Sequence, residues 1–378
     1  QAVTVDHRLR PEAVAEAQLV AQLAARLSID HTILTWDNPP ARGNLQAAAR
    51  AARMRLIGDW ARARGIFSVG LGHTRDDQAE TVLLRLARGS GVDGLAGMAP
   101  EREVAGVRWL RPFLDVSRQD LRAALSARGI AWAEDPSNRD ARFHRVRARR
   151  ALAALAPLGI DAAGLAATAK RLQRARDALE GQTSDALNEL AQDERGTVLL
   201  SPSALNLLPE IRDRLFAHLL LALAGAAHRP RLAALHRWID TAQTTGGTLA
   251  GVRLRPEGRQ LRLFREYRAV AGVRAPLAAA WDGRWRAIAP PAAGAAESGP
   301  QIAALGAEGL RILSRQAAAG KHPHWRETGL PRAALEALPA IWQETRLLAA
   351  PTAGWPAGWA FDLRPAAAPL ATGTIRIE

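Results

Sequence analysis

The chain has 378 residues, of which 48% are hydrophobic, and its 51 Lys and Arg outnumber its 37 Asp and Glu to give a formal net charge of +14. This length is too great for one ordinary domain and predicts two or three. The absence of cysteine excludes a disulfide framework, an iron–sulfur cluster and cysteine-based zinc sites. Nearly all of the positive charge is on arginine, which favours a polyanionic partner such as nucleic acid, although a genome rich in arginine codons would give the same composition.

Residues 1–150 alternate between strand and helix patterns. We predict strands at residues 2–6, 31–35, 66–70 and 107–110. We predict helices at residues 11–27, 45–64, 74–87 and 118–128. Ser117 with Asp120 has the spacing of a capping box at the start of the last helix. The alternation predicts an α/β fold with a Rossmann-like parallel sheet, in which ligands bind at the carboxyl ends of strands.

The sequence after residue 150 is rich in alanine and leucine and changes to helical periodicity. We predict a mainly helical region with helices at 165–179, 202–223 and 232–241 and a β-hairpin at 246–266 whose turn is at 255–258. Residues 270–300 are rich in alanine, proline and glycine, which predicts a linker, and 301–378 form a small C-terminal region. The longest apolar run is well short of the roughly 20 residues of a membrane span, so no membrane is expected. The predicted domains are 1–152, 153–268 and 269–378.

The stretch LGHTRDDQAETVLLRLARGSG gathers acids in this basic chain. Thr74 and Asp77 have capping-box spacing, and Asp76, Asp77 and Glu80 share one face of the predicted helix. A capped helix explains one or two of these acids, because the helix dipole favours negative charge at an N-terminus. It does not explain His73 at the end of a strand or the glycine-rich segment that follows the helix. The stretch is therefore a candidate functional site.

The segment GHTRDDQAETVLLRLARGSGVDGL resembles a signature of the tRNA(Ile)-lysidine synthetases, which belong to the N-type ATP pyrophosphatases of the PP-loop superfamily. Four other segments are similar to family motifs in the same order: VDHRLRPEA, GNLQAAARAARMRL, RPFLDVSRQDLRAAL and EDPSNRDARFHRVRARRAL. Together they cover most of residues 1–152. After residue 152 the resemblance is weaker and rests on TLAGVRLRPEGRQLRLFRE and LPAIWQETRLLAAP, which look like the family's tRNA-binding region and tail.

The resemblance implies a two-step ligation in the cytoplasm. ATP, with Mg²⁺, adenylates O2 of the wobble cytidine in a tRNA(Ile) with a CAU anticodon. The ε-amine of free L-lysine then displaces AMP to give lysidine. The implied partners are this tRNA and L-lysine, and a homodimer is one candidate assembly.

The resemblance also implies roles for individual residues. Asp77 is the first candidate for binding the lysine amine or helping to deprotonate it, and His73 for contacting the reacting groups. Arg50 and Arg53, three residues apart on one helix face, are candidates for neutralising phosphate charge. Glu80 either holds magnesium or braces the helix, and we favour the brace. The alternative for His73 is an ordinary hydrogen bond at the end of a strand. The alternative for Arg50 and Arg53 is a solvated helix face.

Two further groups of candidates follow from the matched motifs. The residues expected beside ATP are Val5, Asp6 and His7. The arginine strip, expected to contact tRNA phosphates, consists of Arg142, Arg145, Arg147, Arg149 and Arg150. The alternative for the arginine strip is a plain solvated helix face.

The chain departs from the family pattern at three places. Met54 stands where a tyrosine is usual, and Arg145 is followed by Val146 instead of asparagine. The family's phosphate loop, Ser-Gly-Gly-x-Asp-Ser, is not found in the sequence. We expect the chain to be a fragment without this loop and impaired in catalysis, or else unable to use ATP.

Two other functions remain open from the sequence. One is another PP-loop tRNA-modifying enzyme such as a tRNA thiolase, although those relatives typically use cysteines. The other is a catalytically inactive tRNA-binding protein, which would bind tRNA in a salt-sensitive way without turning over ATP.

Overall fold

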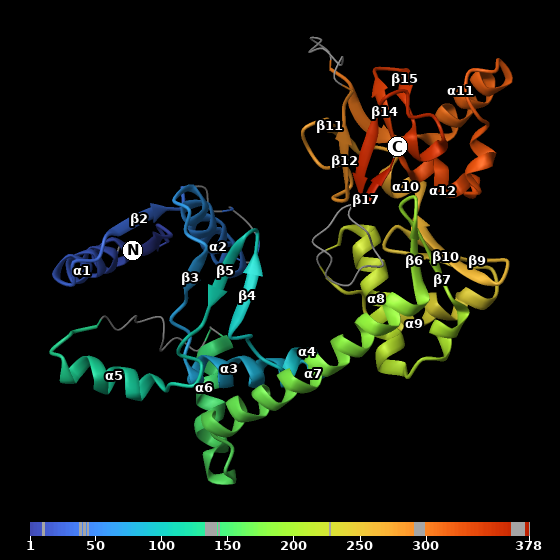
Figure 1. Ribbon diagram of the computed structural model, residues 1–378. Coiled ribbons are helices and arrows are strands. Elements are labelled where there is room, and N and C mark those ends of the chain that lie inside the picture. Colours follow the sequence, from blue (N-terminus) through green and yellow to red (C-terminus); the bar gives the residue numbers. More distant parts are fainter. Residues whose placement is uncertain are drawn as a thin grey trace. The chain divides into compact units, whose positions relative to one another are not determined.

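The computed structural model describes residues 1–9, 12–37, 40, 43, 45–132, 142, 144–226, 228–290, 299–363 and 375–377. The chain divides into two compact units, Gln1–Asp177 and Ala178–Glu378, which are described separately below (Figure 1). The domain boundaries expected at residues 152 and 268 stay predictions.

The strands of the first unit form two small sheets. One is the parallel pair of β1 (Ala2–Asp6) and β2 (His31–Thr35). In the other, β3 (Ser68–Gly70) pairs in parallel with β5 (Val107–Leu110), and β4 (Glu101–Val104) is antiparallel to β5. These parallel pairs confirm the predicted α/β class, but in the described residues the parallel strands lie in two pieces and β4 was not expected.

Helices follow the strands as the alternation predicts. They are α1 (Glu12–Arg26), α2 (Leu45–Ala63), α3 (Arg75–Leu86), the short α4 (Val92–Leu95), α5 (Arg118–Ala127) and α6 (His144–Leu155). Both predicted capping boxes are confirmed, at Thr74 for α3 and at Ser117 for α5. The hydrophobic core packs α2 against β3 and β5 through Ile57, Trp60 and Trp109. This packing places the carboxyl end of β3 at the start of α3.

The first part of the second unit is a five-stranded antiparallel sheet with helices packed against it. Its order is β6 (Ala191–Glu194), β7 (Thr197–Leu200), β10 (Gln260–Arg265), β9 (Val252–Glu257) and β8 (Gly247–Leu249). The long helix α7 (Ala162–Leu190) leads into β6, and α8 (Pro209–Ala224) and α9 (Leu232–Asp240) contribute to the core. Leucine and valine side chains from the strands, such as Leu254 and Leu263, complete that core.

The rest of the second unit has its own core, around Trp281, Trp285 and Phe361. One sheet has the order β11 (Arg274–Pro276), β13 (Gln301–Ala304), β14 (Pro339–Gln343) and β15 (Arg346–Ala349). A second sheet has the order β12 (Trp285–Ile288), β16 (Ala360–Leu363) and β17 (Ile375–Ile377). The helices are α10 (Tyr267–Val270), α11 (Gly306–Ala318) and α12 (Arg332–Ala337).

Three local expectations are corrected here. The predicted helix 202–223 is two elements, a 3-10 turn at Pro202–Asn206 and then α8, because Pro209 starts a new helix. The hairpin turn is later than expected, because Pro256 and Glu257 still pair within β9 and the chain turns at Gly258, whose φ is +58°. The predicted linker 270–300 contains β11 and β12 in its described part, since its tryptophans enter the core.

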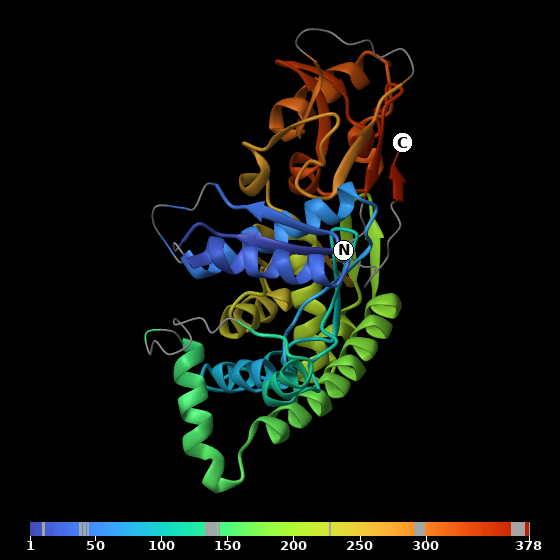
Figure 2. The same cartoon turned by 90° about the vertical axis from the view of Figure 1, so that its left-hand side faces the viewer.

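No single helix among the described residues is long and apolar enough to cross a membrane. The pair His144–Leu158 and Ala162–Leu190 passes that test only when taken together, and it is bent by 98° (Figure 2).

Candidate active site

A cavity of about 540 Å³ lies in the first unit between β1 and β3, beside the N-terminus of α3. We call it the strand-end cavity. Its lining residues are Val3, Thr4, Val5, His7, Arg53, Ile57, Val69, Gly70, Leu71, Gly72, His73, Asp77 and Arg145. The cavity therefore brings together residues from four of the five matched sequence motifs, and it does so where the parallel strands end.

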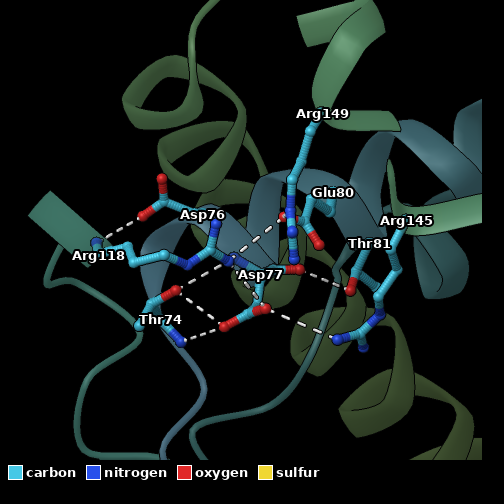
Figure 3. A network of polar contacts seen from close by, with 8 residues as sticks. All are labelled: Thr74, Asp76, Asp77, Glu80, Thr81, Arg118, Arg145 and Arg149. Atoms are coloured by element: carbon cyan, nitrogen blue, oxygen red, sulfur yellow. Dashed lines mark hydrogen bonds and ion pairs between the residues drawn. The ribbon is translucent and has the colours of Figure 1, made fainter. Parts of the chain in front are cut away.

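Asp77 is held in place by the residue that caps its own helix. Its Oδ2 accepts hydrogen bonds from the backbone N–H and the hydroxyl of Thr74, each at 2.8 Å (Figure 3). Its Oδ1 lies 3.4 Å from Nη2 of Arg118 and 3.6 Å from Nη1 of Arg145. Burial acts to raise the pKa of Asp77, but the Thr74 hydrogen bonds and the two guanidinium groups outweigh it and lower that pKa. Asp77 is thus a fixed carboxylate with one oxygen directed toward cations.

The other two acids of α3 bind neighbouring helices. Asp76 accepts a 2.7 Å hydrogen bond from the backbone N–H of Arg118, the first residue of α5. Glu80 has a side chain that is only 1% exposed, and its Oε1 accepts from Nε of Arg149 on α6 at 2.5 Å (Figure 3). Nη2 of Arg118 also approaches Glu80 Oε1, at 3.4 Å. The acids of α3 are therefore not an open ligand cluster, because donors from Arg118, Arg145 and Arg149 already contact them.

Glu80 does not fit a magnesium site. Mg²⁺ takes several oxygen ligands in near-octahedral geometry. One Glu80 oxygen faces two guanidinium groups, and the other has no hydrogen-bond partner among the described residues. No group of three or more Asp, Glu, His or Cys in that part of the chain could hold a metal ion. The contacts of Glu80 join α3 to α5 and α6, and the brace role that we favoured from the sequence stays a prediction.

Several arginine side chains lie in or near the strand-end cavity. Burial, followed by the charge of Arg50 and then of Arg145, lowers the pKa of Arg53, which lines the cavity. Burial and the charge of Arg145 likewise lower the pKa of Arg50, which lies outside the lining. Nε of Arg53 has no hydrogen-bond partner among the described residues. Three mutually repelling guanidinium groups favour binding of an anion.

The two histidines are held in their neutral forms. Burial, together with the charges of Arg111, Arg50 and Arg145, lowers the pKa of His73 to about 4, against the opposing charge of Asp77. Burial and then Arg53 lower the pKa of His7, whose ring is edge-on to Trp36 with centroids 5.8 Å apart. Near neutral pH both rings therefore offer a neutral N–H donor and a lone pair.

The structure separates the other predicted residues. Val5 and His7 line the strand-end cavity, whereas Asp6 is outside its lining and accepts a 2.9 Å hydrogen bond from the backbone of Arg8. Within the arginine strip, Arg145 lines the cavity and Arg149 binds Glu80. The remaining members of the strip are exposed: Arg142, Arg147 and Arg150. Its members therefore do not form one uniform face.

Sequence reasoning missed Arg118 and a clamp behind α3. Gln78 donates to the carbonyl of Met98 at 2.9 Å and accepts from its N–H at 2.7 Å. Arg85 donates to the carbonyls of Gly94 and Gly97 at 2.7 and 2.9 Å. These bonds explain the glycine-rich segment after α3, because a Cβ on Gly97 would lie 2.6 Å from Oε1 of Gln78. The one signal that the sequence offered for this clamp was the glutamine within α3, Gln78.

Comparisons with known proteins place the chain in a family. Residues 1–156 match the family model of a PP-loop domain. The chain is 44% identical over 362 residues to a tRNA(Ile)-lysidine synthase from Ruegeria pomeroyi, with 95% of this chain and 83% of that protein covered. It is 46% identical over 230 residues to the one from Methylobacterium nodulans, with 60% and 68% covered. For the one from Rhodopseudomonas palustris, the identity is 44% over 274 residues, with 67% and 79% covered.

Among solved structures, the U34-tRNA thiolase from Methanococcus maripaludis matches with a TM-score of 0.39 and 13% identity, over 46% of this chain and 60% of that one. The identities to the curated relatives extend over both units, and their names agree with the family that the sequence motifs resemble. The chain therefore belongs to the tRNA(Ile)-lysidine synthase family.

Proposed function

We propose that this protein ligates L-lysine to the wobble cytidine of a CAU-anticodon tRNA(Ile) in the cytoplasm, at the expense of ATP. In the first step, O2 of the cytidine attacks the α-phosphorus and pyrophosphate leaves. In the second step, the lysine ε-amine forms a bond to C2, the C2–O bond breaks, and AMP and a proton leave. The observation that carries the proposal is a fixed carboxylate, Asp77, which among the described residues is the one acid lining a cavity that also contains Arg53 and Arg145.

Asp77 is suited to binding the lysine ammonium group. Its lowered pKa keeps it ionised near neutral pH, and its Oδ1 is directed toward cations. The same lowered pKa makes it a weak general base, because a base is efficient when its pKa is near the working pH. We therefore assign Asp77 to charge recognition and orientation of the amine, and not to its deprotonation.

His73 is suited to a neutral contact with the reacting groups. With a pKa of about 4 it carries no charge at neutral pH, so it does not repel the incoming ammonium group. Its Nδ1 is buried and has no hydrogen-bond partner among the described residues, which leaves it available to a substrate atom.

Arg50 and Arg53 are suited to the phosphate groups of ATP. Arg53 is half-buried and Arg50 is more exposed, and their lowered pKa values have the same causes, partial desolvation and repulsion by neighbouring guanidinium groups. A bound polyphosphate would relieve both, and the same groups would stabilise negative charge that develops on the leaving pyrophosphate. Mg²⁺ would be bound mainly through the phosphates, since Glu80 offers no site of its own.

The exposed members of the arginine strip are suited to the tRNA backbone. Arg142, Arg147 and Arg150 project from the segment that also carries Arg145 into the strand-end cavity. Contacts between these guanidinium groups and phosphates would position the anticodon loop without reading its sequence.

The test is ATP-dependent incorporation of labelled lysine into a CAU-anticodon tRNA(Ile). Asp77→Ala should reduce incorporation by about a hundredfold or more, because it removes the charge that orients the amine. Asp177→Ala is the matched control, since Asp177 is an exposed acid paired with its neighbour Arg176. Equal incorporation by the parent protein and Asp77→Ala would refute the role of Asp77. Salt-sensitive tRNA binding without any incorporation, also in a version that carries the family's Ser-Gly-Gly-x-Asp-Ser loop, would favour the inactive binding protein instead.

A further inference from the structure

Arg145 occupies the position that a substrate ammonium group needs. Its Nη1 lies 3.6 Å from Oδ1 of Asp77, the oxygen that Thr74 leaves free (Figure 3). Both residues line the strand-end cavity. A cation at this oxygen neutralises Asp77 before any substrate arrives, so an ammonium group has to compete with the protein's own guanidinium group.

Arg145 can leave without moving its helix, because Arg149 anchors α6 separately. Arg149 meets the buried Glu80 at 2.5 Å, whereas the Arg145 side chain is 44% exposed and its contact with Asp77 is longer than a normal hydrogen bond. Arg118 also faces Asp77, but its Nη2 is shared with the buried Glu80 and it lies outside the cavity lining. Of the two cations beside Asp77, Arg145 is the detachable one.

Neighbouring charges favour a second position for Arg145. Arg53 also lines the cavity, and Arg145 is close enough to Arg50 and Arg53 that its charge lowers the pKa values of both. A polyphosphate anion near Arg53 would attract Arg145 away from Asp77, because one anion can then contact several guanidinium groups.

We propose that Arg145 is an exchangeable counter-ion, which blocks Asp77 in the empty protein and moves to a polyphosphate anion when one binds. This rests on the proposed function, since it takes Asp77 as the lysine-recognition residue. Arg145 then makes the lysine site dependent on the phosphate site. Lysine binds weakly until the polyphosphate is in place, and by linkage each ligand strengthens the binding of the other.

The test measures L-lysine binding by calorimetry in the absence of tRNA. Without any phosphate ligand, Arg145→Ala should lower the Kd for lysine by about two- to fivefold, the range expected from freeing one partner of an exposed ion pair. Arg62→Ala is the matched control, because Arg62 is an equally exposed arginine, 45% against 44%, in an ion pair with Asp59 elsewhere in the unit. Its lysine affinity should equal that of the parent.

The second arm adds inorganic pyrophosphate. In the parent protein it should lower the Kd for lysine, and in Arg145→Ala this effect should be absent, because the blocking cation is already gone. A parallel titration with CAU-anticodon tRNA distinguishes the two phosphate sources. An effect of tRNA alone, or lysine binding that is unchanged or weaker in Arg145→Ala, would overturn the proposal.

The variant Asp77→Ala distinguishes a failure of the exchange proposal from a failure of the proposed function. If Asp77→Ala abolishes lysine binding while Arg145→Ala does not tighten it, the exchange proposal fails and the lysine-recognition role stands. If the parent and Asp77→Ala bind lysine equally, or if no variant binds it, the lysine-recognition role fails and the exchange proposal fails with it.

Discussion

Two groups of side chains centred on arginine, one in each unit, differ in their charge balance. This difference distinguishes a structural network from a candidate binding site. In the second unit, Arg262 is 4% exposed and donates to Glu257 at 2.6 Å, to Glu194 at 2.5 Å and to Thr197 at 2.7 Å. Burial acts to lower the pKa of Arg262, but the two carboxylates outweigh it and raise that pKa. In the first unit the balance is reversed, because burial and mutual repulsion lower the pKa values of Arg50 and Arg53.

The comparison teaches that burial of arginine is not itself a sign of function. Arg262 has its counter-charges within the fold and needs nothing from outside. Arg53 has no hydrogen-bond partner for Nε among the described residues and lines a cavity. The stability that a folded protein loses at an unbalanced cluster can be regained when a ligand of opposite charge binds.

The largest effect on stability is expected when Arg262, the arginine with its own counter-charges, is removed. Arg262→Ala leaves two partly buried carboxylates facing each other and should lower the free energy of unfolding of the second unit by about 3 kcal/mol. Arg53→Ala should leave the first unit at least as stable, because it removes a repelling charge. Urea unfolding followed by tryptophan fluorescence measures both. A loss in Arg53→Ala as large as that in Arg262→Ala would contradict the distinction.

A smaller effect is expected at the brace between α3 and α6. Glu80→Gln keeps the side-chain shape but removes the negative charge opposite Arg149, and should cost about 2 kcal/mol of stability. Glu101→Gln is the control, because Glu101 is an exposed acid paired with Arg108 at 3.3 Å and should cost less than about 0.5 kcal/mol. Equal unfolding midpoints for the two variants would show that Glu80 is not a brace.

The smallest expected effect is a pH dependence from His73. Its pKa is about 4 in the folded protein and near 6.5 when unfolded, so the unfolded state binds more protons between these values. Stability should therefore rise as the pH increases from 4 to 6.5, and partial solvent screening keeps the gain from this group to about 1–2 kcal/mol. His73→Asn should flatten that part of the stability curve. A curve of unchanged slope in the variant would assign the pH dependence to other groups.

Local features of the first unit could be predicted from the sequence. The capping boxes at Thr74 and Ser117 depend on residues three apart, and the strands depend on short apolar runs. The position of Asp77 beside His73 follows from the same helix start. Because these signals are contained within a few residues, a single sequence reveals them.

Long-range pairings could not be predicted in the same way. Arg149 meets Glu80 across 69 residues of chain, and nothing in either neighbourhood specifies the partner. The alanine-rich composition of residues 270–300 also concealed a folded segment, because Trp281 and Trp285 outweigh their small neighbours in building a core. Burial by distant elements decides such cases, and composition within a window does not record it.

The partners of the α3 acids on α5 and α6 also determine when the site can exist during synthesis. Asp76 needs the start of α5, and Asp77 and Glu80 need Arg145 and Arg149 of α6. A nascent chain that has exposed α3 alone therefore has the acids but not the geometry that gives them separate tasks. Since domains form largely from the N-terminus as the chain emerges, substrate recognition is acquired only when the last of these three segments has left the ribosome.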